Sequence, residues 1–288
     1  SMNLVLGSTL VDMYVKLGCL LKAREVFNML PIRDVILWNT LIGGYATHEC
    51  GKVLDCFNQM ELEGLSPNSI TFSHCLKACG SIINMEKGME IHGEIIKKGL
   101  LKEDQIVSNA LIGMYVKCGM LAEAQEVFDK LLVRDVVSWT TLITGYTKQN
   151  FGKEALKCFE QMQLEGNSPD IITMACSLNA CISVGAGHKG EEYFTEIAKT
   201  GLLEKDVFIG CALVNMYAKC GLLSNAQDVF DNLPVRDTVL WNALISGYSA
   251  CNQENEASNC FEHMQIEGVS PDITTYACIL KLLGNAGA

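Results

Sequence analysis

Several features that would indicate an enzyme, a metalloprotein or a membrane protein are missing from this 288-residue sequence. No run of about 18 apolar residues occurs, so no segment is expected to span a membrane. No P-loop, dinucleotide-binding fingerprint or Ser-His-Asp order is present, which argues against the enzyme classes that depend on them. The five histidines are scattered along the chain. Neither a metal site nor any other cofactor is therefore expected.

Basic residues are in deficit. The chain has 22 Lys and Arg against 33 Asp and Glu, which gives a formal net charge of −11. Non-specific affinity for nucleic acid comes from Lys and Arg on phosphates, so this balance alone argues against nucleic-acid binding. Any such function has to depend on the local placement of a few side chains.

Cysteine, by contrast, is abundant, with fourteen residues. Disulfide pairing is not expected, because the array resembles intracellular proteins, where thiols stay reduced. Many of the cysteines occupy apolar positions of a recurring pattern, where Cys acts as a small buried hydrophobe. Examples are Cys118, Cys158, Cys220 and Cys260.

The most informative feature present is a tryptophan that recurs at a nearly constant interval. Trp38, Trp139 and Trp241 lie 101 and 102 residues apart, within the phrases LWNTLIGGY, SWTTLITGY and LWNALISGY. A second phrase recurs between them, and the stretches 109–135 and 211–237 match at 17 of 27 positions. Such self-similarity indicates an array of tandem repeats and not a single globular domain.

The 101- and 102-residue intervals each contain three shorter units. An Asp or Asn precedes each recurring phrase, and we take it as the last residue of a unit. The units are then 4–34, 35–68, 69–104, 105–135, 136–170, 171–206, 207–237 and 238–272, followed by a partial unit, 273–288. Their lengths rotate among short, standard and long, and this rotation explains the tryptophan spacing.

Each unit is expected to form two helices. The unit 136–170 begins with an apolar stripe at helical spacing, formed by Trp139, Leu142, Ile143 and Tyr146. A second stripe follows Gly152, and a Gly-Asn-Ser-Pro turn ends it. Helical hairpins of this size bury their apolar faces only by stacking on neighbours. The sequence therefore predicts an all-α, right-handed α-solenoid superhelix. The partial unit 273–288 holds one helix only, so end-to-end self-association through exposed apolar surface is expected.

These phrases resemble the pentatricopeptide repeat (PPR) family. The combination of NALIGMYVKCGMLAEAQEVFD with RDVVSWTTLITGY, and the rotation of short, standard and long units, is similar to plant arrays of the PLS type without a C-terminal catalytic extension. The resemblance covers residues 4–288. It implies a module that binds single-stranded RNA, with about one base per repeat read by two or three side chains.

The resemblance assigns base reading to the fifth and the last residue of each repeat. The pairs here are Ser8/Asp34, Asn39/Asn68, Ser73/Asp104, Asn109/Asp135, Thr140/Asp170, Ala175/Asp206, Cys211/Asp237 and Asn242/Asp272. Asn, Ser and Thr can hydrogen-bond to the edge of an unstacked base, and Asp accepts only. By the family's code the expected RNA, from its 5′ end, is G, C or U, undefined, U, G, undefined, undefined, U. The long repeats and the Cys211 repeat are left undefined.

The column of Asp has a second interpretation. Each Asp precedes a helix, where Asp is among the best N-caps, so a capping role alone would produce the same column. The polar character of the fifth position in six of eight repeats favours base reading in addition to capping.

Two further sets of side chains follow from the resemblance. The second residue of each repeat is expected to sandwich a base, although helix packing would select the same residues: Val5, Ile36, Ile70, Ile106, Val137, Ile172, Phe208 and Val239. A lysine two residues after the aligned Tyr is expected to meet phosphate, although a solvated helix-end lysine is equally consistent. These lysines are Lys16, Lys117, Lys148 and Lys219. Modest affinity with strong salt dependence is expected.

Catalysis is not expected in this chain. His92-Gly93-Glu94 matches half of a zinc-deaminase signature, but the C-x-x-C half is missing. The resemblance implies an organellar role, in a mitochondrion or a chloroplast, in RNA editing or another processing step. A further domain or a protein factor acting in trans would then supply the chemistry. The alternative is a protein-binding helical scaffold, which the acidic charge slightly favours.

Overall fold

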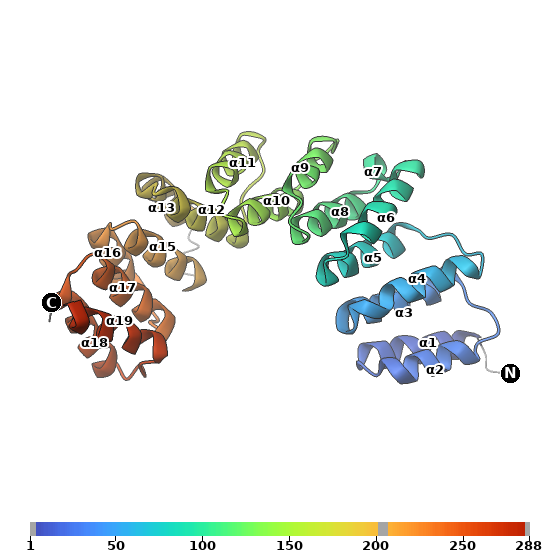
Figure 1. The fold of residues 1–288 in the computed structure, drawn as a ribbon, viewed down its shortest axis with the longest axis horizontal. Coiled ribbons are helices and arrows are strands. Elements are labelled where there is room, and N and C mark those ends of the chain that lie inside the picture. The colour runs from blue at the N-terminus through green and yellow to red at the C-terminus, as the bar shows by residue number, and fades with distance from the viewer. Residues whose placement is uncertain (1–3, 201–206, 286–288) are drawn as a thin grey trace. The chain divides into compact units, whose positions relative to one another are not determined.

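The structure of the chain is a computed structural model that describes residues 4–200 and 207–285. Every regular element in this part of the chain is a helix, as expected (Figure 1). The chain forms two compact units, residues 1–145 and 146–288, and each is described by itself. None of the helices in the described ranges is long and apolar enough to cross a membrane.

The first unit consists of helical hairpins in which each first helix packs on the first helix of the next hairpin. Its helices are α1 (Leu4–Lys16), α2 (Leu20–Met29), α3 (Val35–His48), the 3-10 turn η1 (Cys50–Lys52), α4 (Val53–Leu62), α5 (Ser69–Ile82), α6 (Met85–Lys97), α7 (Leu100–Glu103), α8 (Gln105–Lys117) and α9 (Leu121–Asp129). Helix α10 (Val136–Lys148) begins in this unit and ends in the second. The sequence did not predict the short helix α7.

The second unit repeats the same pattern, with α12, α15, α17 and α19 packed in succession. Its helices are α11 (Gly152–Leu164), α12 (Ile171–Val184), α13 (Gly187–Thr200), α15 (Val207–Lys219), α16 (Leu223–Asn232), α17 (Thr238–Ala250), α18 (Glu254–Ile266) and α19 (Ile273–Asn285). The predicted all-α solenoid of stacked hairpins is confirmed in both units.

The recurring tryptophans join one hairpin to the next. Trp38 is fully buried and packs edge-on against Phe27 of the preceding hairpin, with 4.5 Å between ring centroids. The Phe128–Trp139 and Phe230–Trp241 pairs have the same 4.5 Å separation. Edge-to-face contacts of this kind add to the free energy gained by burial. The tryptophans are therefore structural, and they set the register of the residues beside them.

The turn inside a short repeat depends on glycine. Gly119 adopts a φ of 81°, in the left-handed region that favours glycine. The backbone N–H of Met120 then donates to the carbonyl of Tyr115, which is the six-residue closure of a Schellman motif. This turn ends α8 and returns the chain antiparallel as α9.

The cysteines are less buried than the sequence suggested. Cys118, Cys158, Cys220 and Cys260 are half-buried. Cys75 and Cys181 are buried, and burial raises the pKa of the Cys181 thiol to about 12. All fourteen cysteines are free thiols.

Candidate nucleic-acid interface

The last residue of each predicted repeat is the N-cap of the following helix. The Asp34 carboxylate accepts from the backbone N–H of Leu37 at 2.8 Å, and the Asn68 side chain accepts from Thr71 at 3.1 Å. Equivalent bonds to a backbone N–H two or three residues ahead are made by Asp104, Asp135, Asp170, Asp237 and Asp272. Asp206 lies outside the described residues. Capping is therefore confirmed as one role of the described members of this column.

In three repeats the fifth residue is bonded to the last. The Asn39 amide nitrogen donates to the Asn68 side-chain oxygen at 3.0 Å. Asn242 donates to the Asp272 carboxylate at 2.9 Å. The third pair is Asn109 and Asp135. The structure thus brings together, across each hairpin boundary, the two side chains that the sequence paired.

A buried threonine completes two of these pairs, and the sequence reasoning missed it. The Thr71 hydroxyl donates to the Asn39 oxygen at 2.7 Å, and Thr275 makes the same bond to Asn242. Both threonines are fully buried three residues after an N-cap. The pattern Asn-x-x-Thr or Asp-x-x-Thr at a helix start could have identified them as part of a capping box.

The arrangement leaves hydrogen-bonding capacity on the asparagines. An amide has two N–H donors and two acceptor lone pairs. The bonds to Asn68 and Thr71 engage one donor and one acceptor of Asn39. They fix the orientation of the amide, with one donor and one acceptor remaining for a ligand. This is the complement that a Watson–Crick edge requires.

The remaining fifth residues are less uniform. The Ser8 hydroxyl donates to the Val5 carbonyl of its own helix. Ser73, Thr140 and Cys211 are half-buried, and Ala175 is buried. Thr140 lies in the first compact unit, whereas its partner Asp170 lies in the second. The chemistry at these positions differs from the Asn repeats, so no single contact geometry applies to all eight.

The second residues of the repeats are exposed apolar side chains. Their exposed fractions run from 51% for Ile70 to 76% for Ile36, and all eight are exposed: Val5, Ile36, Ile70, Ile106, Val137, Ile172, Phe208 and Val239. Each lies three residues before a fifth residue, so the two share a helix face. Packing in the protein core does not account for such exposure. Apolar surface placed regularly beside polar groups suits the faces of unstacked bases.

In the second unit these two kinds of side chain line one groove. The groove has a volume of about 640 Å³ and includes Phe208, Cys211, Asp237, Val239 and Asn242. Its other walls come from α12, α15, α17 and the start of α19: Ala175, Asn179, Ala212, Asn215, Ala243, Ser246 and Thr274. Predicted readers and predicted sandwich residues of successive repeats therefore meet in a single concave surface.

The four lysines do not all have the same surroundings. Lys16 pairs with Asp12 at 2.7 Å, one turn earlier in α1. Lys117, Lys148 and Lys219 are exposed. Lys148 and Lys219 line the same hollow of about 370 Å³, together with Thr147, Asn150, Asn179, Ile182 and Ser183. Two ammonium groups beside hydroxyl and amide donors are a suitable environment for an anion.

The Asp272 carboxylate, at the last position of its repeat, is held in its ionised form. Hydrogen bonds from the Thr275 backbone N–H and from the Asn242 amide lower the pKa of Asp272 below its ordinary value. The Asp272 side chain is thus an acceptor, and it aims the Asn242 amide.

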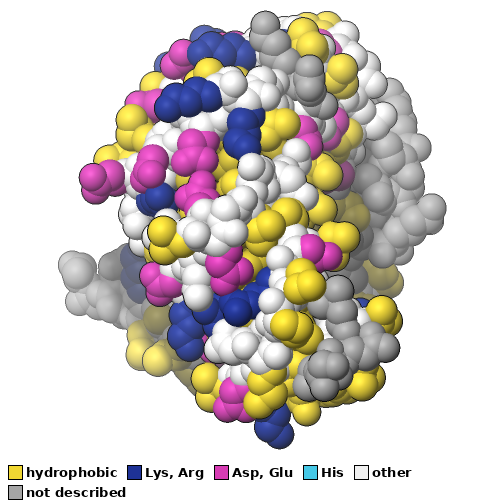
Figure 2. All heavy atoms as spheres, turned by 90° about the vertical axis from the view of Figure 1, so that its right-hand side faces the viewer, with side chains coloured by type: hydrophobic (Ala, Val, Ile, Leu, Met, Phe, Trp, Pro, Cys, Tyr) yellow, Lys and Arg dark blue, Asp and Glu magenta, His cyan; other side chains and the backbone are white. Residues whose placement is uncertain are grey.

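Charge is not segregated by sign on the face of the N-terminal part that Figure 2 draws. Figure 2 shows acidic and basic side chains interspersed with apolar ones over one face. The overall excess of acid does not form one continuous acidic patch there.

His92, which belongs to the segment that matches half of a zinc-deaminase signature, has a structural role. His92 Nδ1 lies 2.7 Å from the Tyr115 hydroxyl, and the two rings pack edge-on at 5.6 Å. Burial lowers the pKa of His92. Within the described residues, no three His, Cys, Asp or Glu side chains are grouped as a metal site would require.

Comparison with known proteins gives a consistent match along the chain. The PPR repeat family models match residues 33–81, 134–183 and 236–285, and residues 8–35, 106–136 and 211–237. The chain is 38% identical, over 97% of its length, to pentatricopeptide repeat-containing protein At3g09040, mitochondrial, of Arabidopsis thaliana, and covers 27% of that protein. It is 36% identical to At4g18520, chloroplastic, of the same species, over 99% of its own length and 46% of the relative.

Solved structures show the same fold. The crystal structure of the pentatricopeptide repeat protein PPR10 from maize aligns with all of this chain at a TM-score of 0.83 and 19% identity, over 42% of the maize chain. PPR10 in complex with an 18-nt psaJ RNA element aligns with 99% of this chain at a TM-score of 0.79, over 43% of that chain. The chain spans less than half the length of the relatives and structures named here.

Proposed function

The chain belongs to the pentatricopeptide repeat family, and we propose that its array binds single-stranded RNA with base selectivity, at roughly one base per repeat. The observation that carries the proposal is the pairing of fifth and last residues. Three Asn side chains are each fixed by the residue that caps the next helix. A purely structural cap would not need an oriented amide beside it.

The exposed apolar column supports the proposal independently. Eight Val, Ile or Phe side chains stand in solvent one turn before the proposed readers. Stacking on base faces depends little on sequence, so these residues would supply affinity. The polar pairs would supply the choice of base. This division of labour is consistent with a chain of net charge −11, because little of the affinity has to come from phosphate contacts.

The proposed target follows from the pairs. Asn109/Asp135 and Asn242/Asp272 would select U, and Asn39/Asn68 a pyrimidine. Ser8/Asp34 and Thr140/Asp170 would select G. The long repeats, with Ser73/Asp104 and Ala175/Asp206, and the repeat with Cys211/Asp237, are assigned no base. Lys117, Lys148 and Lys219 would meet phosphates, with Lys16 partly engaged by Asp12.

In the longer protein this array would be the recognition module of an organellar RNA editing or processing factor. The two relatives described above are named as mitochondrial and chloroplastic proteins. Catalysis would come from another domain or from a factor acting in trans.

A gel-shift titration tests the proposal. The probe is a single-stranded RNA carrying G-C-N-U-G-N-N-U, and the competitor has the same composition in scrambled order. Preferential binding of the ordered RNA supports base reading by the array. Equal binding of both RNAs would reject base reading, and no binding to either would favour a protein-binding scaffold.

A further inference from the structure

Three short repeats each meet the following standard repeat through a Phe–Trp contact, and the first and the last of these sites lie one in each compact unit. Phe27 packs on Trp38 in the first copy, and Phe230 packs on Trp241 in the second. An ion pair of 2.6 Å closes one side of each copy, formed by Arg33 with Glu63 and by Arg236 with Glu267. The aromatic wall and the ion pair are therefore the same in both.

In the first copy an arginine fills the site. The Arg24 guanidinium lies over the rings of Phe27 and Trp38, at 5.4 and 5.6 Å from their centroids. It donates to the Gln59 side-chain oxygen and lies 3.4 Å from the Cys56 sulfur. These are a cation–π contact and directed hydrogen bonds to one planar group. The protein itself thus shows which chemical group fits this wall.

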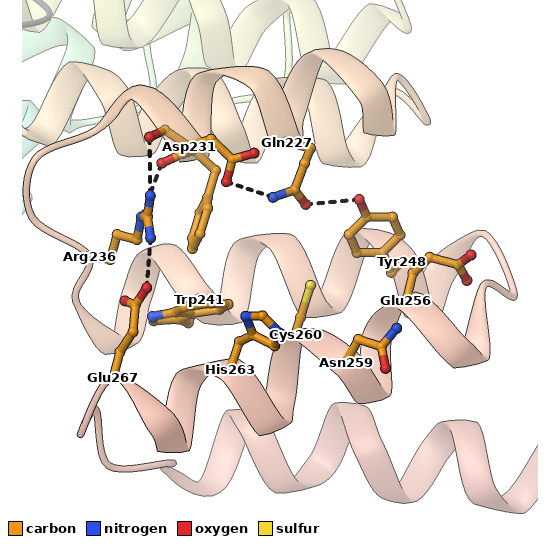
Figure 3. Close-up of a pocket in the computed structure, with 11 residues that line it drawn as sticks. Gln227, Asp231, Arg236, Trp241, Tyr248, Glu256, Asn259, Cys260, His263 and Glu267 are labelled. Atoms are coloured by element: carbon orange, nitrogen blue, oxygen red, sulfur yellow. Dashed lines mark hydrogen bonds and ion pairs between the residues drawn. The ribbon is translucent and has the colours of Figure 1, made fainter.

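In the second copy the arginine is replaced. Gln227 stands at the position of Arg24, and its amide is held between Asp231 and Tyr248, at 2.9 and 3.0 Å (Figure 3). The shorter side chain leaves a hollow of about 240 Å³, lined by Trp241 and Cys260. The Trp241 side chain is buried, with an exposed fraction of 3%, and its indole Nε1 has no hydrogen-bond partner. In the first copy the equivalent Trp38 Nε1 donates to Glu63 at 3.1 Å.

The charges around the hollow have changed to match a cation. Asn28 of the first copy is Asp231 in the second, and Lys52 is Glu256. The second copy thus has three acids (Asp231, Glu256 and Glu267) against one base (Arg236), a formal charge of −2. The first copy has Arg24, Arg33 and Lys52 against Glu63 and Asp55, the counterpart of Asn259, a formal charge of +1. The cation at the Arg24 position is lost and negative charge is gained nearby, while Arg236 still lies over the Phe230 ring, 4.9 Å from its centroid.

The thiols at equivalent positions, Cys56 in the first copy and Cys260 in the second, have different charged neighbours. Burial, Asp231 and Glu256 together raise the pKa of Cys260 to about 11. Burial also raises the pKa of Cys56, but there Arg24 and Lys52 act in the opposite direction. Beyond the effect of burial, the Asp231 and Glu256 carboxylates therefore disfavour further negative charge in the second copy.

We propose that the hollow between α16, α17 and α18, floored by Trp241, is a receptor site for an arginine side chain of a partner protein. The arginines of this chain are Arg24, Arg33, Arg134 and Arg236, and each is engaged with its own neighbours. The carboxylates of Asp231, Glu256 and Glu267 around the hollow repel an RNA phosphate. The site shares no lining residue with the RNA groove, so the proposal does not depend on RNA binding.

The test uses the indole N–H signals of the three tryptophans in a ¹H–¹⁵N NMR spectrum of the full chain. The probe is Nα-acetyl-arginine methylamide, with the citrulline and lysine analogues as matched controls. We expect a saturable shift of the Trp241 signal with the arginine compound and at least a threefold weaker response to lysine. The Trp38 signal should not move, because Arg24 fills its site. The citrulline analogue, which has the shape of the arginine side chain without its charge, should leave the Trp38 and Trp241 signals unchanged.

Two reciprocal variants complete the test. Gln227→Arg should supply the guanidinium internally and abolish the Trp241 response. Arg24→Gln should open the first copy and give Trp38 a response. Glu256→Lys, an exposed change, should weaken the Trp241 response about threefold to fivefold without affecting the fold. A Trp241 signal that stays still, that moves equally with citrulline, or that responds unchanged in Gln227→Arg would overturn the proposal.

Discussion

The Asn109 amide nitrogen lies 3.2 and 3.3 Å from the two carboxylate oxygens of Asp135, across the boundary between two successive hairpins. One oxygen of Asp135 also accepts from the Ser138 backbone N–H at 2.8 Å. A single carboxylate therefore begins a helix and orients an amide on the neighbouring helix. Stability and the proposed base selection meet at this residue, and variants can separate them.

Asn109→Thr should move the preference at one base from U toward G and leave the other positions unchanged. Threonine replaces an amide donor and acceptor with a hydroxyl, so the base that fits the edge changes. The measurement is competition binding with RNAs that differ only at this position. Asn215→Thr, on the groove wall but outside the reading column, is the control. An equal shift in both variants would contradict the assignment of Asn109.

Asp135→Ser and Asp135→Ala should separate capping from reading. Serine retains N-cap bonding and should change the free energy of unfolding by only a few tenths of a kcal/mol, whereas alanine should cost about 1 kcal/mol. Both remove the carboxylate that orients Asn109, so both should lose selectivity at that base. Denaturant unfolding and RNA competition measure the two effects. Retained selectivity in Asp135→Ser would mean that the carboxylate serves the cap alone.

Ile106→Ser should weaken RNA binding by about threefold to tenfold without changing base preference. The Ile106 side chain is 62% exposed, so its loss should change the free energy of unfolding by less than about 0.5 kcal/mol. Ile112→Ser in the same helix is the structural control, because Ile112 is fully buried and should destabilise the fold strongly. A large loss of stability in Ile106→Ser would identify a packing role.

The sequence was sufficient to predict the hairpins, the caps and the repeat register marked by the tryptophans, because each depends on residues close together in the chain. Asp before an apolar stripe defines a helix start wherever the hairpin lies. The difference between Arg24 and Gln227 could not be interpreted in this way. Its meaning depends on side chains about 30 residues ahead, such as Gln59 and Glu256, and on which face of the hairpin they meet.

The sequence also could not predict which apolar side chains of a helix are exposed. An Ile on an apolar stripe suits the core and the groove alike, and only the packing of α8 shows that Ile112 is buried while Ile106 is not. Thr71 and Thr275 were missed because a threonine in a helical stripe has no distinctive signal until its N-cap partner is considered.

Asp272 should titrate below the usual range for an aspartate. Hydrogen bonds to its ionised form lower its folded pKa, so its contribution to stability is present above the unfolded pKa and is lost as the pH falls through the folded value. A ¹³C NMR titration of the carboxylate measures this pKa. Asn242→Ala should raise it, because one of the bonds is removed, while the Thr275 N–H keeps it below the ordinary value. Asn255→Ala, on an exposed part of α18, should have no effect.

Lys148→Gln and Lys219→Gln should each reduce the salt dependence of RNA binding without altering base preference. Each lysine that contacts a phosphate of single-stranded RNA releases a counterion, which contributes about −0.7 to the slope of log K against log salt concentration. The two lysines line one hollow, so the double variant should lose about twice as much slope as either single variant. Lys157→Gln removes the same charge from the exposed surface of α11 and should leave the slope nearly unchanged. If Lys157→Gln lowered the slope as much, the effect would reflect net charge and not contact, and the assignment of Lys148 and Lys219 to phosphate would fail.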